Sequence, residues 1–244
     1  QEHVELGAVI ETPVAALGAR DLAREADFLT VSLDSLQQYL LAADRENPRK
    51  ALADTFTVIA MDQRNAGKSI ADVGPDHGWH TFAADHLALI DHLGFDKFHV
   101  MGGCIGGSYC FEAIEQAPGR VAAAVLQNPI GLWENRDTWD AAIKGYGETV
   151  RARDPSISQA TVASFGHNMS GGDFVFSVTR DFVKACHTPL LLQPGTDKPH
   201  PAHTSTEIAA LAPNIEVQKD WRGPEFLQES IRRVRNFLTK HTPK

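Results

Sequence analysis

No run of apolar residues in this chain approaches the roughly 18–20 residues needed to cross a bilayer. An excess of positive charge is also absent, since 31 acidic side chains outweigh 23 basic ones and give a formal net charge of −8. That balance argues against nucleic acid or an anionic membrane as the main partner. We therefore expect a small-molecule substrate, with no nucleic-acid partner and no membrane partner.

Cysteines are few: only Cys104, Cys110 and Cys186 occur, and no CxxC pair is present. An odd, small number in a chain of this length does not form a disulfide framework and favours a reducing compartment. Residues 1–5 lack the basic region followed by an apolar stretch that marks a secretory signal. We expect a cytoplasmic protein. The sequence leaves the oligomeric state open, and a homodimer is compatible with it.

Motifs for common cofactors and metals are missing as well. No GxGxxG follows the first strand of a βα unit, and residues 102–107 lack the Lys-Ser/Thr pair of a phosphate loop. The histidines are scattered, and the His200-x-x-His203 pair does not fall on a clear helix. We expect neither a cofactor nor a metal.

What the chain does have is the composition of a globular protein, with 43% hydrophobic and 22% charged residues. Alternating strands and helices over residues 56–127 predict an α/β fold with a parallel sheet and crossover helices. The predicted strands are residues 28–31, 56–61, 98–101, 121–126, 189–192 and 215–217, and the predicted helices are residues 33–44, 79–93, 108–117, 138–153, 158–168, 173–184, 204–211 and 225–240.

The alternation breaks between residues 131 and 186, which hold several predicted helices and no convincing strand. An insertion at this place lies over the carboxyl ends of the strands, where open α/β sheets bind ligands. We therefore expect a core of residues 1–130 and 187–244 and a helical lid of residues 131–186. The candidates for an aromatic pocket wall in this lid are Trp133, Trp139 and Tyr146.

The most informative motif is Gly102-Gly103-Cys104-Ile105-Gly106-Gly107, which lies between an apolar strand and a helix. This is the context of a nucleophile elbow, a sharp turn that presents one reactive side chain between small residues. Glycine is expected on both sides because the turn leaves no room for flanking Cβ atoms. Cys104 stands at the reactive position, and a thiol becomes a nucleophile more readily than a hydroxyl does.

Four segments in the expected order resemble the α/β-hydrolase superfamily: FTVIAMDQRNAGKS (56–69), HLALIDHLGFDKFHVMGGCIGGS (86–108), AAVLQNPIG (123–131) and TPLLLQPGTDKPHP (188–201). The cysteine in the elbow is similar to that of the dienelactone-hydrolase group, and the paired glycines also resemble serine acyltransferases. The resemblance implies an α/β-hydrolase fold, which is a mostly parallel twisted sheet flanked by helices with a lid inserted between strands. It also implies a nucleophile–histidine–acid triad.

Two members of that triad have counterparts here. The resemblance makes Cys104 the nucleophile, at a helix N-terminus whose partial positive charge favours a thiolate. It makes the backbone N–H of Ile105 a donor to the oxyanion. The acid that follows the penultimate strand is Asp197, and the alternative acid position holds Asn128, which strengthens the case for Asp197.

Two other family features are missing. The stretch after the last strand, residues 217–224, contains no histidine, although the family's catalytic histidine lies there. The His-Gly pair that shapes the oxyanion loop is replaced by Val31-Ser32-Leu33-Asp34, so Leu33 becomes the candidate for the second oxyanion donor. The standard triad therefore cannot be assumed.

Other residues are candidates for the base. His200 and His203 follow Asp197 on its own loop and could approach Cys104, with Asp197 orienting the ring. His77 and His80 are candidates for the pocket rim, whereas His86, His92 and His99 fall in helix or strand periodicity and fit packing or surface roles better. Lys219 and Arg222, where the histidine is missing, suit a carboxylate. An unassisted thiolate is the remaining alternative.

These residues predict a hydrolase that cleaves an ester, lactone or thioester of a small carboxylic acid through an acyl-enzyme on Cys104. An acyltransferase of the same fold is an alternative. A further alternative is a non-hydrolytic member with an incomplete triad that binds a ligand or senses an electrophile.

The first prediction concerns thiol reactivity. Iodoacetamide should alkylate Cys104 faster than Cys110 or Cys186, because only Cys104 is expected at a pocket open to solvent. Peptide mass spectrometry after timed alkylation measures the three rates. Preferential labelling of Cys186 would contradict the assignment of the elbow.

Overall fold

The computed structural model describes residues 7–10, 28–31 and 52–243, which belong to two compact units. The smaller unit contains the chain up to Ile59 together with Gly223–Arg235. In it, β1 (Gly7–Ile10) and β2 (Phe28–Val31) form a parallel pair, which confirms the strand predicted at 28–31. The predicted helix at 33–44 lies outside the described residues.

The larger unit, Ala60–Arg222 with the chain from Asn236 onward, is built on a four-stranded parallel sheet. The strands occur in the order β3 (Phe98–Gly103), β4 (Val121–Gln127), β5 (Leu190–Gln193) and β6 (Ile215–Val217), all close to the predicted segments. Both β4 and β5 are continuous apolar runs, as expected for parallel strands that are covered on both faces.

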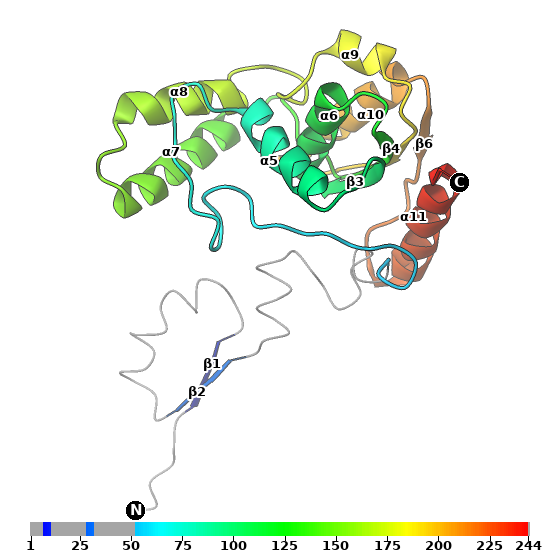
Figure 1. Ribbon diagram of the computed structural model, residues 1–244, viewed down its shortest axis with the longest axis horizontal. Helices are drawn as coiled ribbons and strands as arrows, with labels where there is room; N and C mark the ends of the chain where they lie inside the picture. The colour runs from blue at the N-terminus through cyan, green and yellow to red at the C-terminus, as the bar shows by residue number, and fades with distance from the viewer. Residues whose placement is uncertain (1–6, 11–27, 32–51, 244) are drawn as a thin grey trace, which may run out of the picture. The chain divides into compact units, whose positions relative to one another are not determined.

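Crossover helices connect these strands, as the strand–helix alternation predicted. The helix α5 (Trp79–His92) precedes β3, α6 (Gly106–Gln116) joins β3 to β4, and α10 (Ala202–Leu211) joins β5 to β6. Figure 1 shows α5 and α6 side by side against the strands. The main core cluster contains Phe111 of α6 and Ile208 of α10.

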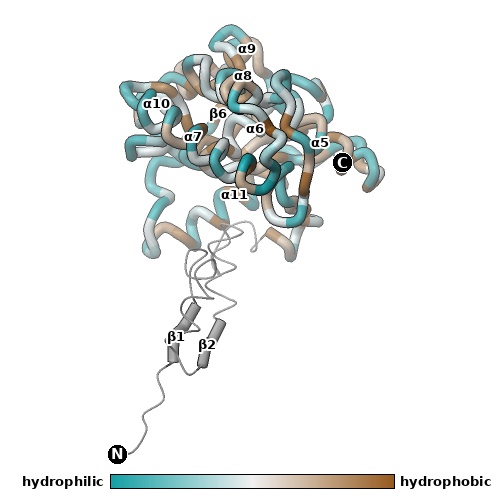
Figure 2. Tube along the Cα trace, turned by 90° about the vertical axis from the view of Figure 1, so that its left-hand side faces the viewer, coloured by the Kyte–Doolittle hydropathy of each residue, from teal (hydrophilic) through white to brown (hydrophobic). Residues whose placement is uncertain are grey.

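The chain ends with the short helix η1 (Pro224–Phe226) and the helix α11 (Leu227–His241). Along α10 and α11 the tube in Figure 2 alternates between hydrophilic and hydrophobic segments, as expected for helices with one buried face. The predicted helix at 225–240 is thus confirmed, with its first turn tightened into η1.

The insertion, residues 131–186, holds α7 (Arg136–Arg153), α8 (Gln159–Ser170) and α9 (Arg180–Ala185). Figure 1 shows α7 and α8 side by side beyond α5. Ser158 caps α8 by accepting a hydrogen bond from the Thr161 N–H at 3.0 Å. An N-cap residue precedes the first helical residue, so the helix begins at Gln159 and not at Ser158, where the sequence predicts its start.

The predicted helix at 173–184 is wrong in its first half. Residues 171–179 form bends and turns, and α9 begins only at Arg180. Phe174 and Val175 are almost completely buried in the main core cluster, and Phe174 has a positive φ of 54°. Tertiary burial of these two side chains outweighs the local helical periodicity.

The strand predicted at 56–61 is also wrong. Residues 57–61 have no strand hydrogen bonds, and the side chains of Val58 and Ile59 are 45% and 38% exposed. A strand requires a neighbour that supplies backbone partners, and among the described residues β3 pairs only with β4. An apolar, β-branched run alone does not provide that neighbour.

The elbow between β3 and α6 has the tight geometry that its sequence predicts. Cys104 has a φ of 58°, a left-handed conformation that non-glycine residues seldom adopt. A Cβ on Gly102 would overlap the backbone of Gly106, and one on Gly107 would come within 2.9 Å of the Pro129 Cβ. A Cβ on Gly106 would meet nothing within 4 Å, so the glycines that close packing requires on the two sides of Cys104 are Gly102 and Gly107 and not Gly106.

This difference gives a matched pair of variants. Gly102→Ala should destabilise the protein by at least about 2–3 kcal/mol, because the new methyl group overlaps backbone atoms that cannot move separately. Gly106→Ala should be neutral or stabilise by up to about 1 kcal/mol, since alanine favours the helix. Urea unfolding midpoints compare the two. Equal effects would show that the turn is less constrained than the structure indicates.

Candidate active site

The carboxyl ends of the parallel strands bring three polar segments to one edge of the sheet. Gly103, Gln127 and Gln193 are partners in register across β3, β4 and β5. The next residues continue this row, because the Cys104 N–H donates to the Gln127 carbonyl at 3.0 Å and the Asn128 N–H donates to the Gln193 carbonyl at 2.7 Å. This is the edge at which open α/β sheets bind their ligands.

The Cys104 side chain is partly buried and packs against an aromatic cluster that includes Trp79, Phe82 and Phe165. Burial raises the pKa of the Cys104 thiol, the nearby Ile105 N–H lowers it, and the negative charge of Asp197 raises it further. The net shift is upward, which contradicts the expectation of a helix-stabilised thiolate. At neutral pH the group is a thiol, so its attack requires a base.

Of the two expected oxyanion donors, Ile105 and Leu33, the structure describes Ile105. Ile105 is the N-cap of α6, and its N–H faces the Cys104 sulfur. The Ile105 side chain is 38% exposed and lines the adjacent cavity. Leu33 lies outside the described residues.

Asp197 and His200 form a hydrogen-bonded pair on the loop after β5. The Asp197 carboxylate accepts the His200 backbone N–H at 3.1 Å and contacts the ring Nδ1. Arg222 donates to the other carboxylate oxygen at 3.3 Å. Burial alone would raise the pKa of Asp197, but the hydrogen bonds and the charge of these partners lower it below its ordinary value.

The second ring nitrogen of His200 has no partner within the described residues. This nitrogen, Nε2, is buried. In a catalytic triad the carboxylate of the acid bonds one ring nitrogen of the histidine, and the other ring nitrogen acts as the base. Within the described part of the chain, no hydrogen bond yet joins this nitrogen to Cys104. The loop is packed closely, since a Cβ on Gly195 would overlap the backbone of His200.

His203 does not share the carboxylate. Its ring stacks on Trp133, with centroids 3.4 Å apart and planes 9° from parallel. The stack adds to other contacts between the insertion and the Asp197 loop. The buried Asn135 amide donates to the Lys198 carbonyl at 2.7 Å, and Lys198 pairs with Asp137 at 2.5 Å. The insertion thereby holds the loop that carries Asp197 and His200.

The remaining candidates make other contacts. His77 accepts the Gly74 N–H at 3.0 Å, and His80 contacts the Thr81 hydroxyl at 3.3 Å. His86 pairs with the Gln63 amide, and His99 with the Thr242 hydroxyl. Arg222 serves the Asp197 carboxylate, and Asn128 has a positive φ of 34° where its strand ends.

A cavity of about 330 Å³ lies next to the elbow. Its walls are mainly aromatic and aliphatic, and they include the expected Trp139 and Tyr146 but not Trp133, which is 47% exposed. The lining residues come from the loop after residue 61, from α5 and α6 and from the insertion: Gln63, Arg64, Asn65, Ala66, Trp79, Phe82, Ile105, Tyr109, Ile130, Trp139, Ala142, Ile143, Tyr146, Phe165, Met169, Ser170 and Phe176.

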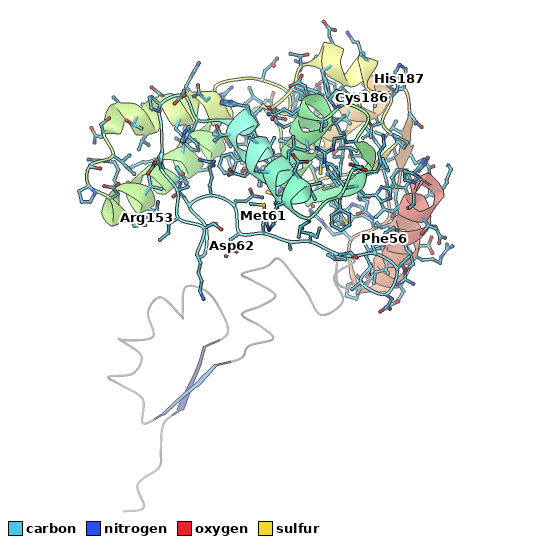
Figure 3. All side chains as sticks on the ribbon, viewed as in Figure 1. Phe56, Met61, Asp62, Arg153, Cys186 and His187 are labelled. Atoms are coloured by element: carbon cyan, nitrogen blue, oxygen red, sulfur yellow. The ribbon has the colours of Figure 1, made fainter. Side chains whose placement is uncertain are left out.

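The polar part of this wall, Gln63 to Asn65, was not among the expected site residues. Arg64 pairs with Asp85 of α5 through two hydrogen bonds of 2.7 Å, which fixes the loop to the core. Asn65 contacts Tyr146 at 3.5 Å and also bonds Arg153, both on α7. Figure 3 shows Arg153 on the same side as Met61 and Asp62, far from Cys186. The DQRN motif was visible in the sequence, but nothing in it indicated a cavity wall.

The described residues offer neither a metal site nor a membrane-spanning helix. Among residues 7–10, 28–31 and 52–243, no three His, Cys, Asp or Glu side chains cluster in a way that could hold a metal ion. No helix in that part of the chain is long and apolar enough to span a bilayer.

A protein-family model described as alpha/beta hydrolase fold matches residues 41–219. This range includes Cys104, Asp197, His200 and the cavity wall, but it excludes Leu33. Comparison with solved structures gives a meta-cleavage product hydrolase from Pseudomonas fluorescens IP01, with a TM-score of 0.59 and 18% identity over 81% of this chain and 85% of that one. At that identity the similarity shows the fold.

Curated relatives fall into two groups. The N-formylmaleamate deformylase of Pseudomonas putida is 24% identical over 147 residues, which are 58% of this chain and 52% of that protein. The phosphoenolpyruvate-protein phosphotransferase of Buchnera aphidicola is 31% identical over 104 residues, or 40% of this chain and 18% of that protein. The chain therefore spans from about a fifth to about half the length of these two relatives.

The structure places His200 in the loop after β5 and His203 in the first turn of α10, and their contacts predict different effects when each is replaced by alanine. His200→Ala should lower turnover by about two to four orders of magnitude, because it removes the only one of them that Asp197 orients. His203→Ala should cost far less, since its ring stacks on Trp133. Steady-state kinetics with an activated thioester measures both variants.

Two controls sharpen this test. Asp197→Asn combined with His200→Ala should cost little more than the worse single change, because the pair acts as one unit. The residual rate of His200→Ala should keep rising above pH 9, since the Cys104 pKa is raised and the thiol must ionise unaided. A larger loss in His203→Ala than in His200→Ala would reverse the assignment.

Proposed function

Because this chain belongs to the alpha/beta hydrolase fold family, we propose that it hydrolyses an ester, lactone or thioester of a small carboxylic acid, with Cys104 as the nucleophile. One observation carries the proposal. The strained elbow presents Cys104 at the same sheet edge as the Asp197–His200 pair, whose free Nε2 can take a proton.

The proposed chemistry starts from a protonated Cys104 thiol, because burial raises its pKa. His200 Nε2 accepts the thiol proton as Cys104 Sγ attacks the carbonyl carbon, and the Ile105 N–H donates to the developing oxyanion. The carbonyl re-forms, the bond to the leaving group breaks, and His200 gives its proton to the leaving oxygen or sulfur. The product of this half-reaction is an S-acyl cysteine.

The second half-reaction repeats the proton transfers with water. His200 takes a proton from the attacking water, the tetrahedral intermediate collapses, and the proton returns to the Cys104 sulfur as the acid leaves. Asp197 stabilises the imidazolium that forms in each half-reaction. These transfers require the thiol and the imidazole to approach each other, because His200 Nε2 has no hydrogen-bond partner among the described residues.

We assign the insertion, residues 131–186, the role of a lid. It supplies Trp139, Tyr146 and Phe165 to the cavity wall and bonds the loop at Asn65 through α7. Opening α7 and α8 away from that loop would give access to the elbow.

A second function is favoured by one specific observation. His200 Nε2 has no hydrogen-bond partner among the described residues, and a base held away from the thioester activates the attacking water poorly, which slows deacylation. The protein would then retain a covalent acyl or electrophile adduct. If a small nucleophile other than water cleaves the thioester, the reaction is acyl transfer. Its product, the acylated nucleophile, distinguishes it from hydrolysis.

The proposal is tested by combining kinetics with intact mass. Cys104→Ala should abolish turnover and acylation, while its unfolding free energy changes by only about 1 kcal/mol because the glycines hold the turn. Wild-type protein should show turnover with a transient acyl mass, and His200→Ala should accumulate it. A stable acyl mass on the wild type without turnover would favour the adduct function, and full activity in Cys104→Ala would remove Cys104 as the nucleophile.

A further inference from the structure

We infer that Asn135 is a positioning residue for the Asp197–His200 pair, because its buried amide joins the tip of their loop, residues 196–200, to the start of the insertion. The inference rests on the proposed function and deepens it by naming the residue that places the base. The carrying observation is an asparagine at the beginning of a helix whose side chain does not cap that helix.

Asn135 is the N-cap of α7, a position at which an asparagine side chain ordinarily accepts a backbone N–H of the first helical turn. Here the side chain makes no such bond, although it is only 1% exposed. Its amide donates to the Gly131 carbonyl at 3.0 Å and to the Lys198 carbonyl at 2.7 Å, and its oxygen accepts the Trp133 N–H at 2.9 Å. The side chain therefore serves the contact with the loop tip rather than the start of its own helix.

The backbone of the loop tip depends on this contact. Just before the tip, the Gly195 N–H donates to the buried Ser205 hydroxyl of α10 at 3.1 Å. Within residues 196–200, the bond from Asn135 is the one backbone hydrogen bond to another element among the described residues. Without it, the backbone that carries the proposed base is held only from its two ends.

Side-chain contacts to the tip are weaker. Asp197 pairs with Arg222 and Lys198 pairs with Asp137, and the four side chains are between 44% and 70% exposed. Exposed ion pairs contribute little, because water screens the charges and the long side chains lose freedom. The buried amide of Asn135 is therefore the stronger constraint on the position of the tip.

The other end of the bridge lies in a closely packed part of the protein. The Leu132 N–H donates to the Phe174 carbonyl at 2.7 Å, and Phe174 is buried in the main core cluster. A Cβ on Gly131 would overlap the buried Thr204 side chain. Because this start of the insertion has little room to shift, Asn135 transmits a fixed position to the loop tip.

Asn135→Asp tests this role without weakening the helix. Aspartate caps a helix N-terminus as well as asparagine does, but when ionised it has no N–H for the Lys198 carbonyl. With an activated thioester, kcat should fall by about tenfold to a hundredfold, because a misplaced catalytic group costs rate in that range. KM should stay within about twofold, since Asn135 does not line the cavity.

A second variant guards against a folding defect. Asn135→Ser keeps a good N-cap residue and also removes the amide that bridges the two carbonyls. Its kcat should fall in the same range as that of Asn135→Asp. Urea unfolding midpoints verify that each variant compared is folded.

A double-mutant cycle shows whether Asn135 acts through His200. In a His200→Ala background, Asn135→Asp should lower kcat by less than about twofold, because the group that it positions is already gone. A purely structural role would cost the same in both backgrounds. The matched control is Asn168→Ala, whose amide also donates to two backbone carbonyls, those of Pro75 and His77, at 3.0 and 2.9 Å. It should leave kcat within about twofold.

The alkylation rate of Cys104 separates this inference from the proposed chemistry. A base near the thiol speeds its reaction with iodoacetamide at neutral pH, and no acyl substrate is needed. Asn135→Asp should slow this alkylation by at least about fivefold when His200 is present and by less than about twofold in His200→Ala. Peptide mass spectrometry after timed alkylation measures the rates.

The outcomes are distinct. A His200-dependent loss of alkylation rate supports the inference even if no thioester is turned over, in which case only the proposed function fails. Equal losses in the two backgrounds, or no loss of alkylation rate, overturn the inference even if wild-type turnover is normal. Where turnover occurs, a wild-type kcat in Asn135→Asp, or an equal loss in Asn168→Ala, also overturns it.

Discussion

The parallel alignment of β3, β4 and β5 is the constraint on which the candidate site depends. Their register places Gly103, Gln127 and Gln193 in one row, so the residues that follow each strand share an edge. Within that row the buried Gln127 amide donates to the Gln193 side chain at 2.5 Å, which ties the strands together close to the elbow. Backbone pairing between distant parts of the sequence thus brings a thiol, a carboxylate and an imidazole to one place.

The apolar wall beside this edge influences the chemistry as well as the binding. Packing of aromatic groups around Cys104 excludes water, and burial raises the pKa of the thiol. In the proposed mechanism the neutral thiol depends on a base, and the Asp197–His200 pair is the one that we propose.

The insertion, residues 131–186, contacts both the loop of Asp197 and the loop that contains Asn65. At its beginning, Asn135 donates to Lys198 in the loop of Asp197 and His200, and Trp133 stacks on His203 in the first turn of α10. Farther along, Tyr146 and Arg153 of α7 contact Asn65 on the loop at the opposite wall of the cavity. A movement of the insertion would therefore act on the cavity and on the Asp197–His200 loop together.

The sequence by itself determined the fold family, most helices and strands of the larger unit, and the elbow around Cys104, because these depend on local spacing and on glycines at a sharp turn. It did not determine the strand at 56–61 or the helix at 173–179, since strand pairing and the burial of Phe174 depend on distant neighbours. It named both His200 and His203 as candidates for the base. The tertiary structure separated their contacts, by bonding one ring to Asp197 and stacking the other on Trp133. The upward shift of the Cys104 pKa was likewise decided by packing, because a helix N-terminus is a local feature whereas desolvation comes from everything that surrounds the thiol.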